Sequence, residues 1–286
     1  MHNPTTLFLT LALSLAACGS KDSDDDTGAT EVIDDEGGEE ALDESDNDEG
    51  GTDEGGDDSS DPMTGTVSGS IVDEAGAVMN VANVKLCTPM LCRTTEPDNE
   101  GNFEFIELEE ATFALEIKSD DENSATMMGF IDLSMEEART LDEPIVVPNF
   151  RTSDNLGSTR TIAVDGGLNV SVDPGYEPPF GINVEEKIKG VHVVDPSTSG
   201  LPIDGIEGEI VGLWYLGTWN TLVPAGWSFT IDSLPGVAEG ESLTVLTGDY
   251  ASSSWVNEGT ATVGADGSIT ADEGTGITFL STFVLV

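Results

Sequence analysis

Basic residues are scarce in this chain. Its 286 residues include 9 Lys and Arg against 56 Asp and Glu, which gives a formal net charge of −47 at pH 7. A protein that binds nucleic acid needs clustered Lys and Arg to neutralise phosphates. The composition therefore excludes nucleic acid as a partner.

Histidine is scarcer still, with His2 and His192 only. A serine triad needs a histidine base, and zinc sites need several His or Cys ligands. The chain has no Gly-x-Ser-x-Gly elbow and no His-x-x-Glu pair, and the residues around His192 are typical of an ordinary strand. We predict no enzyme activity, no metal site and no cofactor. Carboxylates are abundant and no pair stands out; a cleft where several converge would favour the enzyme alternative.

Long apolar runs are missing as well. The apolar segment from Leu7 to Leu15 is shorter than the roughly 20 residues that cross a bilayer, and it suits the core of a signal peptide. It ends in Leu15-Ala16-Ala17-Cys18, which resembles the lipobox of bacterial lipoproteins. The segment before it, Met1 to Pro4, departs from the usual signal peptide because it contains no Lys or Arg.

The lipobox resemblance implies a membrane anchor. Residues 1–17 would be removed, and Cys18 would carry two or three acyl chains, which together give lasting attachment to the lipid bilayer. Gly19 is not the aspartate that favours retention of enteric lipoproteins in the inner membrane. The resemblance therefore places the protein in the cell envelope, at the outer membrane, facing the periplasm or the surface.

The segment 18–62 is an acidic tether. Between Asp22 and Asp61 it holds 20 acidic residues, no basic residue and few apolar ones. Such a segment cannot offset the entropy of ordering, so we predict disorder. The sequence Asp46-Asn47-Asp48-Glu49-Gly50 is similar to the start of an EF-hand-like calcium loop, but the twelfth position falls on Asp57 instead of a glutamate. A solvated spacer is the favoured interpretation, with calcium binding as the alternative.

Two cysteines remain if Cys18 is acylated, namely Cys87 and Cys92. Because exported proteins form disulfides, we predict that this pair closes the short loop Thr88-Pro89-Met90-Leu91. A metal site at the pair is the weaker alternative, since it would need two further ligands.

The segment 63–148 predicts a small β-sandwich. Apolar residues alternate over 67–72, 81–86 and 113–118, and turns rich in Asp and Gly separate these segments. One short turn of helix is expected at 134–139, where Ser134 is followed by Met, Glu, Glu, Ala and Arg.

Three stretches of this unit resemble the carboxypeptidase regulatory-like domain, a transthyretin-like sandwich: Gly65-Thr66-Val67-Ser68-Gly69-Ser70-Ile71-Val72-Asp73, Gly101-Asn102-Phe103-Glu104-Phe105 and Phe113-Ala114-Leu115. The resemblance covers 63–120 best and implies a module that is not itself catalytic. The insertion from Cys87 to Cys92 departs from the simple strand and turn of that family.

The segment 150–286 predicts a second β-sandwich, from short apolar alternations separated by Gly and Asp turns. The expected fold class is thus all-β, with two β-sandwich domains behind a cleaved signal peptide and a disordered tether. The ending Thr278-Phe279-Leu280-Ser281-Thr282-Phe283 has a weak resemblance to the last strand of ZU5-like sandwiches, some of which cleave themselves at His-Phe-Ser. This chain has Phe279-Leu280-Ser281 there, with no histidine directly before it, so self-cleavage is not expected.

All four tryptophans lie between 214 and 255. Trp214, Trp227 and Trp255 alternate with Leu and Val or follow such segments, and we predict that they fill the core. Trp219 and Tyr250 lie beside small polar residues, which makes them the candidate surface aromatics for ligand binding.

Two functions are compatible with these features. The leading hypothesis is a non-catalytic, lipid-anchored cell-envelope protein whose β-sandwiches serve adhesion, scaffolding or capture of a protein or glycan. The alternative is a carbohydrate-binding lipoprotein of a polysaccharide uptake or degradation system, which would use exposed rings such as those of Trp219 and Tyr250 to stack on sugars.

Overall fold

The computed structural model describes residues 64–80, 82–155, 160–172, 187–217 and 221–286, all within one compact unit that spans 58–286. Cys18, the predicted signal peptide and the acidic tether lie outside the described residues. The described part is all-β, as predicted, with two short 3-10 helices (Asp165–Gly167 and Pro196–Thr198) and no α-helix. Neither of these described helices is long and apolar enough to cross a membrane.

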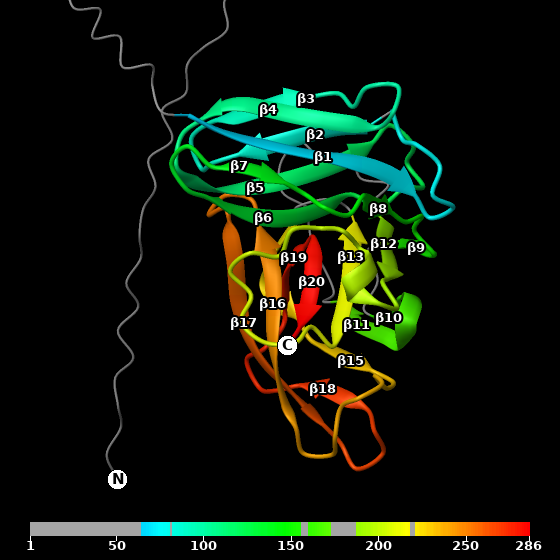
Figure 1. The fold of residues 1–286 in the computed structure, drawn as a ribbon. Coiled ribbons are helices and arrows are strands. Elements are labelled where there is room, and N and C mark those ends of the chain that lie inside the picture. Colours follow the sequence, from blue (N-terminus) through cyan, green and yellow to red (C-terminus); the bar gives the residue numbers. More distant parts are fainter. Residues whose placement is uncertain (1–63, 81, 156–159, 173–186, 218–220) are drawn as a thin grey trace, which may run out of the picture. The chain divides into compact units, whose positions relative to one another are not determined.

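Eight strands form the first group, shown in blue to green in Figure 1: β1 (Gly65–Asp73), β2 (Ala82–Cys87), β3 (Cys92–Thr95), β4 (Asn102–Leu108), β5 (Ala111–Ser119), β6 (Met127–Leu133), β7 (Ala138–Thr140) and β8 (Ile145–Val147). One sheet has the order β4-β1-β7, with β8 also paired to β1, and the other has the order β3-β2-β5-β6. β7 and β8 run parallel to β1, and the remaining pairs are antiparallel.

These two sheets share one apolar core. Alternate residues of each strand face it, so that Val67 and Ile71 from β1 meet Leu115 and Ile117 from β5, all four fully buried. The packing therefore confirms what the alternation of apolar residues predicts, because successive side chains of a strand point to opposite faces of its sheet.

The short helix expected at 134–139 is a wrong prediction. A turn occupies its start, where Glu136 has a positive φ of 60°, and β7 occupies its end. β7 pairs with β1, and Arg139 lies 3.1 Å from a carboxylate oxygen of Asp204. Strand pairing and this ion pair thus outweigh the local helix propensity, which is a weak preference over so few residues.

Twelve strands form the second group within the described residues, shown in green to red in Figure 1: β9 (Thr152–Asn155), β10 (Arg160–Ala163), β11 (Leu168–Val172), β12 (Lys187–His192), β13 (Gly212–Gly217), β14 (Thr221–Trp227), β15 (Phe229–Ile231), β16 (Ser242–Asp249), β17 (Ser254–Val263), β18 (Ile269–Ala271), β19 (Ile277–Leu280) and β20 (Thr282–Leu285). Ten of them form one sheet in the order β10-β11-β15-β18-β17-β16-β20-β13-β12-β9, and β14 pairs with β19.

Aromatic rings fill the second core. Trp214 and Trp227 are fully buried, as predicted, and Trp214 packs against Phe283 with ring centroids 5.6 Å apart. Phe229 meets the same Phe283 ring edge-to-face at 5.1 Å. Trp255 differs from the other two tryptophans because it is only half-buried.

The core of the first group also contains Leu213, Tyr215 and Val284 of the second group. A further small apolar cluster joins the two groups of strands, and we call it the seam. It contains Ala114, Met128 and Phe130 from β5 and β6, with Tyr250 and Trp255 packed against them. The rings of Phe130 and Trp255 are edge-to-face, with centroids 4.8 Å apart. Apolar contact therefore connects the second sheet of the first group to the β16–β17 region of the second.

Hydrogen bonds along β6 reinforce the seam. The backbone N–H of Met128 donates to the hydroxyl of Thr282 at 2.9 Å, and that of Phe130 donates to the carbonyl of Pro202 at 3.0 Å. β6 is an edge strand of its own sheet, so these bonds satisfy backbone groups that would otherwise be left unpaired.

Gly129 provides a test of this packing. A Cβ there would overlap the carbonyl oxygen of Pro202 and come within 2.8 Å of the Leu201 side chain. We predict that Gly129→Ala lowers the free energy of unfolding by about 1–3 kcal/mol, measured by chemical denaturation of the full chain. Gly248→Ala is the control, because the atoms nearest to its Cβ would be side-chain atoms of Met128 and Phe130 at 3.4 Å or more. Equal stabilities of the two variants would contradict the described packing of β6 against Leu201 and Pro202.

Candidate functional site at the disulfide hairpin

The hairpin between β2 and β3 is closed by a disulfide, as predicted. Cys87 and Cys92 are bonded and face each other across the strand pair, with Cα atoms 4.0 Å apart. Inside the loop the backbone N–H of Thr88 donates to the carbonyl of Leu91 at 2.9 Å, and the Thr88 hydroxyl accepts from the backbone N–H of Leu91 at 3.2 Å. The turn is therefore held both covalently and by local hydrogen bonds.

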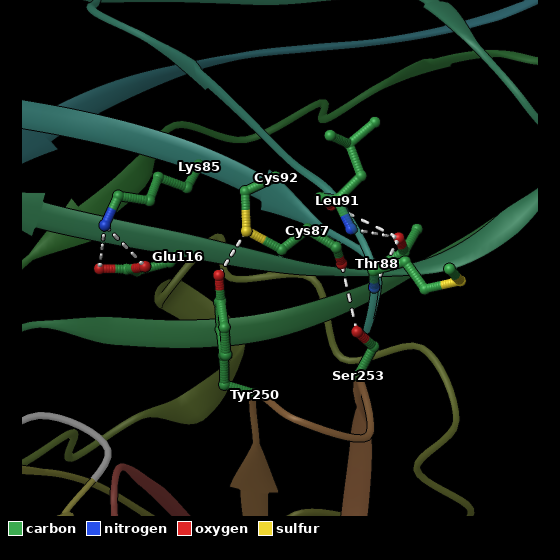
Figure 2. The surroundings of a disulfide bond; sticks show 9 residues. Lys85, Cys87, Thr88, Leu91, Cys92, Glu116, Tyr250 and Ser253 are labelled. Atoms are coloured by element: carbon green, nitrogen blue, oxygen red, sulfur yellow. Dashed lines mark hydrogen bonds and ion pairs between the residues drawn. A yellow bond between two sulfur atoms is a disulfide. The ribbon is translucent and has the colours of Figure 1, made fainter. Parts of the chain in front are cut away.

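The β16–β17 loop holds the base of this hairpin, as Figure 2 shows. The Tyr250 hydroxyl donates to the sulfur of Cys87 at 3.1 Å and also contacts the sulfur of Cys92. The Ser253 hydroxyl donates to the carbonyl of Cys87 at 3.2 Å, in buried surroundings. Two side chains from the second group of strands thus fix a loop of the first.

The sequence suggested Trp219 and Tyr250 as surface aromatics for ligand binding. Tyr250 is half-buried in the seam, and its hydroxyl lies on the disulfide, so the structure places it beneath the hairpin. Trp219 lies outside the described residues. A role of either ring in ligand binding stays a prediction.

The tip of the hairpin presents apolar side chains to solvent. Met90 is 95% exposed and Leu91 is 63% exposed, although both are large and apolar. Contiguous exposed apolar side chains are a common feature of interaction sites.

An apolar groove of about 510 Å³ lies beside the tip. Leu86, Leu108 and Phe113 are buried core residues that also line it, and Met90 and Leu91 are its large apolar residues that are exposed. Such a groove can accept a large apolar side chain, because the buried members give it a fixed apolar lining and the exposed members add contact area.

Arg93 connects the two sheets next to the groove. Its guanidinium donates to the backbone carbonyls of Ile106 at 2.6 Å and Glu107 at 2.7 Å, at the end of β4. Glu107 has a positive φ of 55°, an uncommon backbone conformation for a residue other than glycine. The arginine therefore satisfies two carbonyls of an irregular strand end.

A charged pair lies on the same sheet as the hairpin. Lys85 and Glu116 are opposite each other in the β2–β5 ladder, with the ammonium 3.4 Å from both carboxylate oxygens. Glu116 is almost fully buried, and burial raises the pKa of its carboxyl while the charge of Lys85 opposes that shift. The ammonium compensates for part of the cost of burying this carboxylate.

A second cavity of about 520 Å³ is lined by residues around His192. Arg151 lies at its wall and pairs with Glu74, with Asp165 at 4.0 Å. The His192 ring stacks on Trp214 with centroids 4.6 Å apart, and its backbone N–H donates to Asp165 at 3.1 Å. Among the described residues no hydroxyl or thiol hydrogen bonds to this imidazole, so the cavity contains no assembled nucleophile–base pair there.

Metal-binding geometry is also absent from the described residues. No group of three or more His, Cys, Asp or Glu side chains converges in that part of the chain in a way that could hold an ion. The calcium alternative concerned Asp46 to Gly50, which lie outside the described residues.

No protein-family model and no curated protein matches this chain. Matches among solved structures include a streptococcal ancillary pilin, with 13% identity and a TM-score of 0.27 over 78% of this chain and 53% of the pilin chain. Another is a candidate carbohydrate-binding protein from Bacteroides uniformis, with 12% identity and a TM-score of 0.23 over 78% of each chain. A Ca²⁺-stabilised adhesin with which an Antarctic bacterium binds ice has 12% identity and a TM-score of 0.17 over 72% of this chain and 64% of the other.

The chain spans about half the length of the pilin that it matches. TM-scores this low establish neither a shared fold nor a shared activity.

His192 gives a prediction about pH. Burial lowers its pKa, with Asp165 opposing the shift, so the folded protein binds this proton less readily than the unfolded chain does. This difference in proton binding has no effect on the free energy of unfolding above about pH 6.5. Below that value it lowers the free energy of unfolding, increasingly as the pH falls, until folded His192 is protonated too. We expect the free energy of unfolding to decrease between pH 7.5 and 5.5 more in the wild type than in His192→Gln, measured by urea denaturation.

The comparison with His192→Gln removes the contribution of other groups, including Glu116, whose raised pKa brings its titration closer to this range. Parallel pH profiles of the two proteins would show that His192 is not responsible for the loss of stability.

Proposed function

We propose that the protein is a lipid-anchored, non-catalytic component of the cell envelope that captures a partner protein through the disulfide hairpin. The observation that supports this most is the exposure of Met90 and Leu91 at the tip, beside an apolar groove. Burial of apolar surface is the main favourable contribution to most protein association. A large exposed apolar side chain in the centre of an interface can contribute much of the binding energy.

The construction of the hairpin supports a binding role. Its base is fixed by the disulfide and by Tyr250 and Ser253, so the apolar side chains are carried by a loop that is already ordered. A preformed loop loses less conformational entropy on binding than a flexible one, which increases affinity. The tip therefore offers exposed apolar surface at a low ordering cost.

The anchor in this proposal rests on the sequence. Leu15-Ala16-Ala17-Cys18 resembles a lipobox, and acyl chains on Cys18 would hold the protein in the bilayer, at the outer membrane. The 20 acidic residues between Asp22 and Asp61 would repel one another and anionic lipid headgroups, which keeps the folded part away from the membrane. Such a tether would leave the hairpin accessible to a partner.

No observation among the described residues favours the carbohydrate alternative. Trp214 and Trp227 are fully buried, and the Trp255 indole N–H donates to the carbonyl of Asp204 at 3.1 Å. Trp219, on which the alternative also depends, lies outside the described residues. The hairpin is therefore the better supported binding surface.

Photo-crosslinking tests the proposed function. A benzophenone amino acid at position 90 of the full chain should form an adduct with a partner in the cells that make the protein, and Leu91→Ser should reduce that adduct. The same amino acid at position 135 is the matched control, because Met135 is another exposed methionine and does not line the groove. Equal adducts at both positions, or none at position 90, would contradict capture by the hairpin.

A further inference from the structure

The chemistry of the groove rim identifies the kind of partner. Three exposed carboxylates, Glu107, Glu109 and Glu110, follow one another closely at the end of β4 and the turn into β5, and the last two line the groove. Among the described residues that line it, Arg93 is the only one with a cationic side chain. Its guanidinium already donates to the carbonyls of Ile106 and Glu107. The rim therefore has an excess of negative charge beside an apolar interior.

This charge argues against three occupants that the chain could otherwise supply or meet. The tether brings 20 acidic residues and no basic one between Asp22 and Asp61. A second copy of the folded part brings 36 acidic residues against 8 basic ones from position 62 onward. An anionic lipid surface carries the same sign. Each would bring like charge to the rim, which opposes association.

We propose that the groove binds a segment of a partner protein in which a large apolar side chain is flanked by Lys or Arg. The apolar side chain enters between the Met90 and Leu91 side chains and the buried lining, and the flanking cations lie beside Glu109 and Glu110. This proposal rests on the proposed function, since it specifies the partner of the same hairpin.

Peptide binding to the full chain tests this proposal. The probe is a fluorescein-labelled synthetic peptide with a central Leu-Phe pair and two Lys on each side, and its binding is followed by fluorescence anisotropy. Two further peptides serve as controls, one with Glu in place of each Lys and one with Gly-Gly in place of Leu-Phe. We expect the Lys peptide with Leu-Phe to bind most tightly, and its affinity to fall as salt is added.

Three double variants separate the contribution of the exposed apolar residues to peptide binding from that of the rim charges. Met90→Ser with Leu91→Ser should weaken binding of the Lys peptide roughly tenfold or more, because it removes the exposed apolar residues. Glu109→Gln with Glu110→Gln should weaken it roughly 3- to 10-fold, because it removes two rim charges. Glu143→Gln with Glu273→Gln removes the same charge from exposed positions that do not line the groove and should leave the affinity unchanged.

The outcomes distinguish the possible occupants. Equal effects of the two Glu→Gln double variants would mean non-specific attraction to an acidic surface and would overturn the proposal. Self-association that Met90→Ser with Leu91→Ser abolishes would assign the groove to a second copy. Binding of vesicles of anionic lipid by the hairpin, again lost in this variant, would assign it to a membrane. Either result would also overturn the proposal.

Failure of the partner chemistry can be told from failure of the proposed function. If the adduct at position 90 forms in cells while the Lys peptide shows no preference, the hairpin captures a partner of different chemistry. If the adduct is absent and no peptide responds to Met90→Ser with Leu91→Ser, both the partner chemistry and the capture function are wrong.

Discussion

The packing of Phe130 against Trp255 in the seam is the contact on which the account depends. It brings the β16–β17 loop under the first group of strands, so that the Tyr250 hydroxyl reaches Cys87. With its base held there, the hairpin directs Met90 and Leu91 outward. An apolar contact in the interior of the protein thereby fixes the position of exposed apolar side chains on its surface.

Charge sets a second constraint on this structure. A chain with a net charge of −47 repels itself, and such repulsion disfavours the compact state. In the described part, two large apolar cores stabilise the compact state against this repulsion. Few charges are buried, and one of them, Glu116, has Lys85 beside it. The same excess of carboxylates makes a cationic partner the complement of the groove rim at Glu109 and Glu110.

Local patterns predicted the strands at 67–72, 81–86 and 113–118, the disulfide and the burial of Trp214 and Trp227, because alternation and cysteine spacing act over short distances along the chain. They did not predict β6 (Met127–Leu133). They failed at 134–139, where pairing with β1 decides the conformation. The seam joins residues more than a hundred positions apart, such as Phe130 and Trp255, and no local period encodes such contacts. The groove brings together residues of neighbouring strands between positions 86 and 113. One local signal was available for the groove: Met90 and Leu91 are large apolar residues inside a tight loop between two cysteines.

The most direct test of the central claim is amide hydrogen exchange of the hairpin in the full chain. The Thr88 N–H, which donates to the Leu91 carbonyl, should exchange slowly in the wild type and faster in Tyr250→Phe with Ser253→Ala, while amides of the β1–β4 ladder remain unchanged. That result would show that the second group of strands holds the binding loop in place. Exchange of the Thr88 amide at the rate of an unstructured peptide in the wild type would contradict the account.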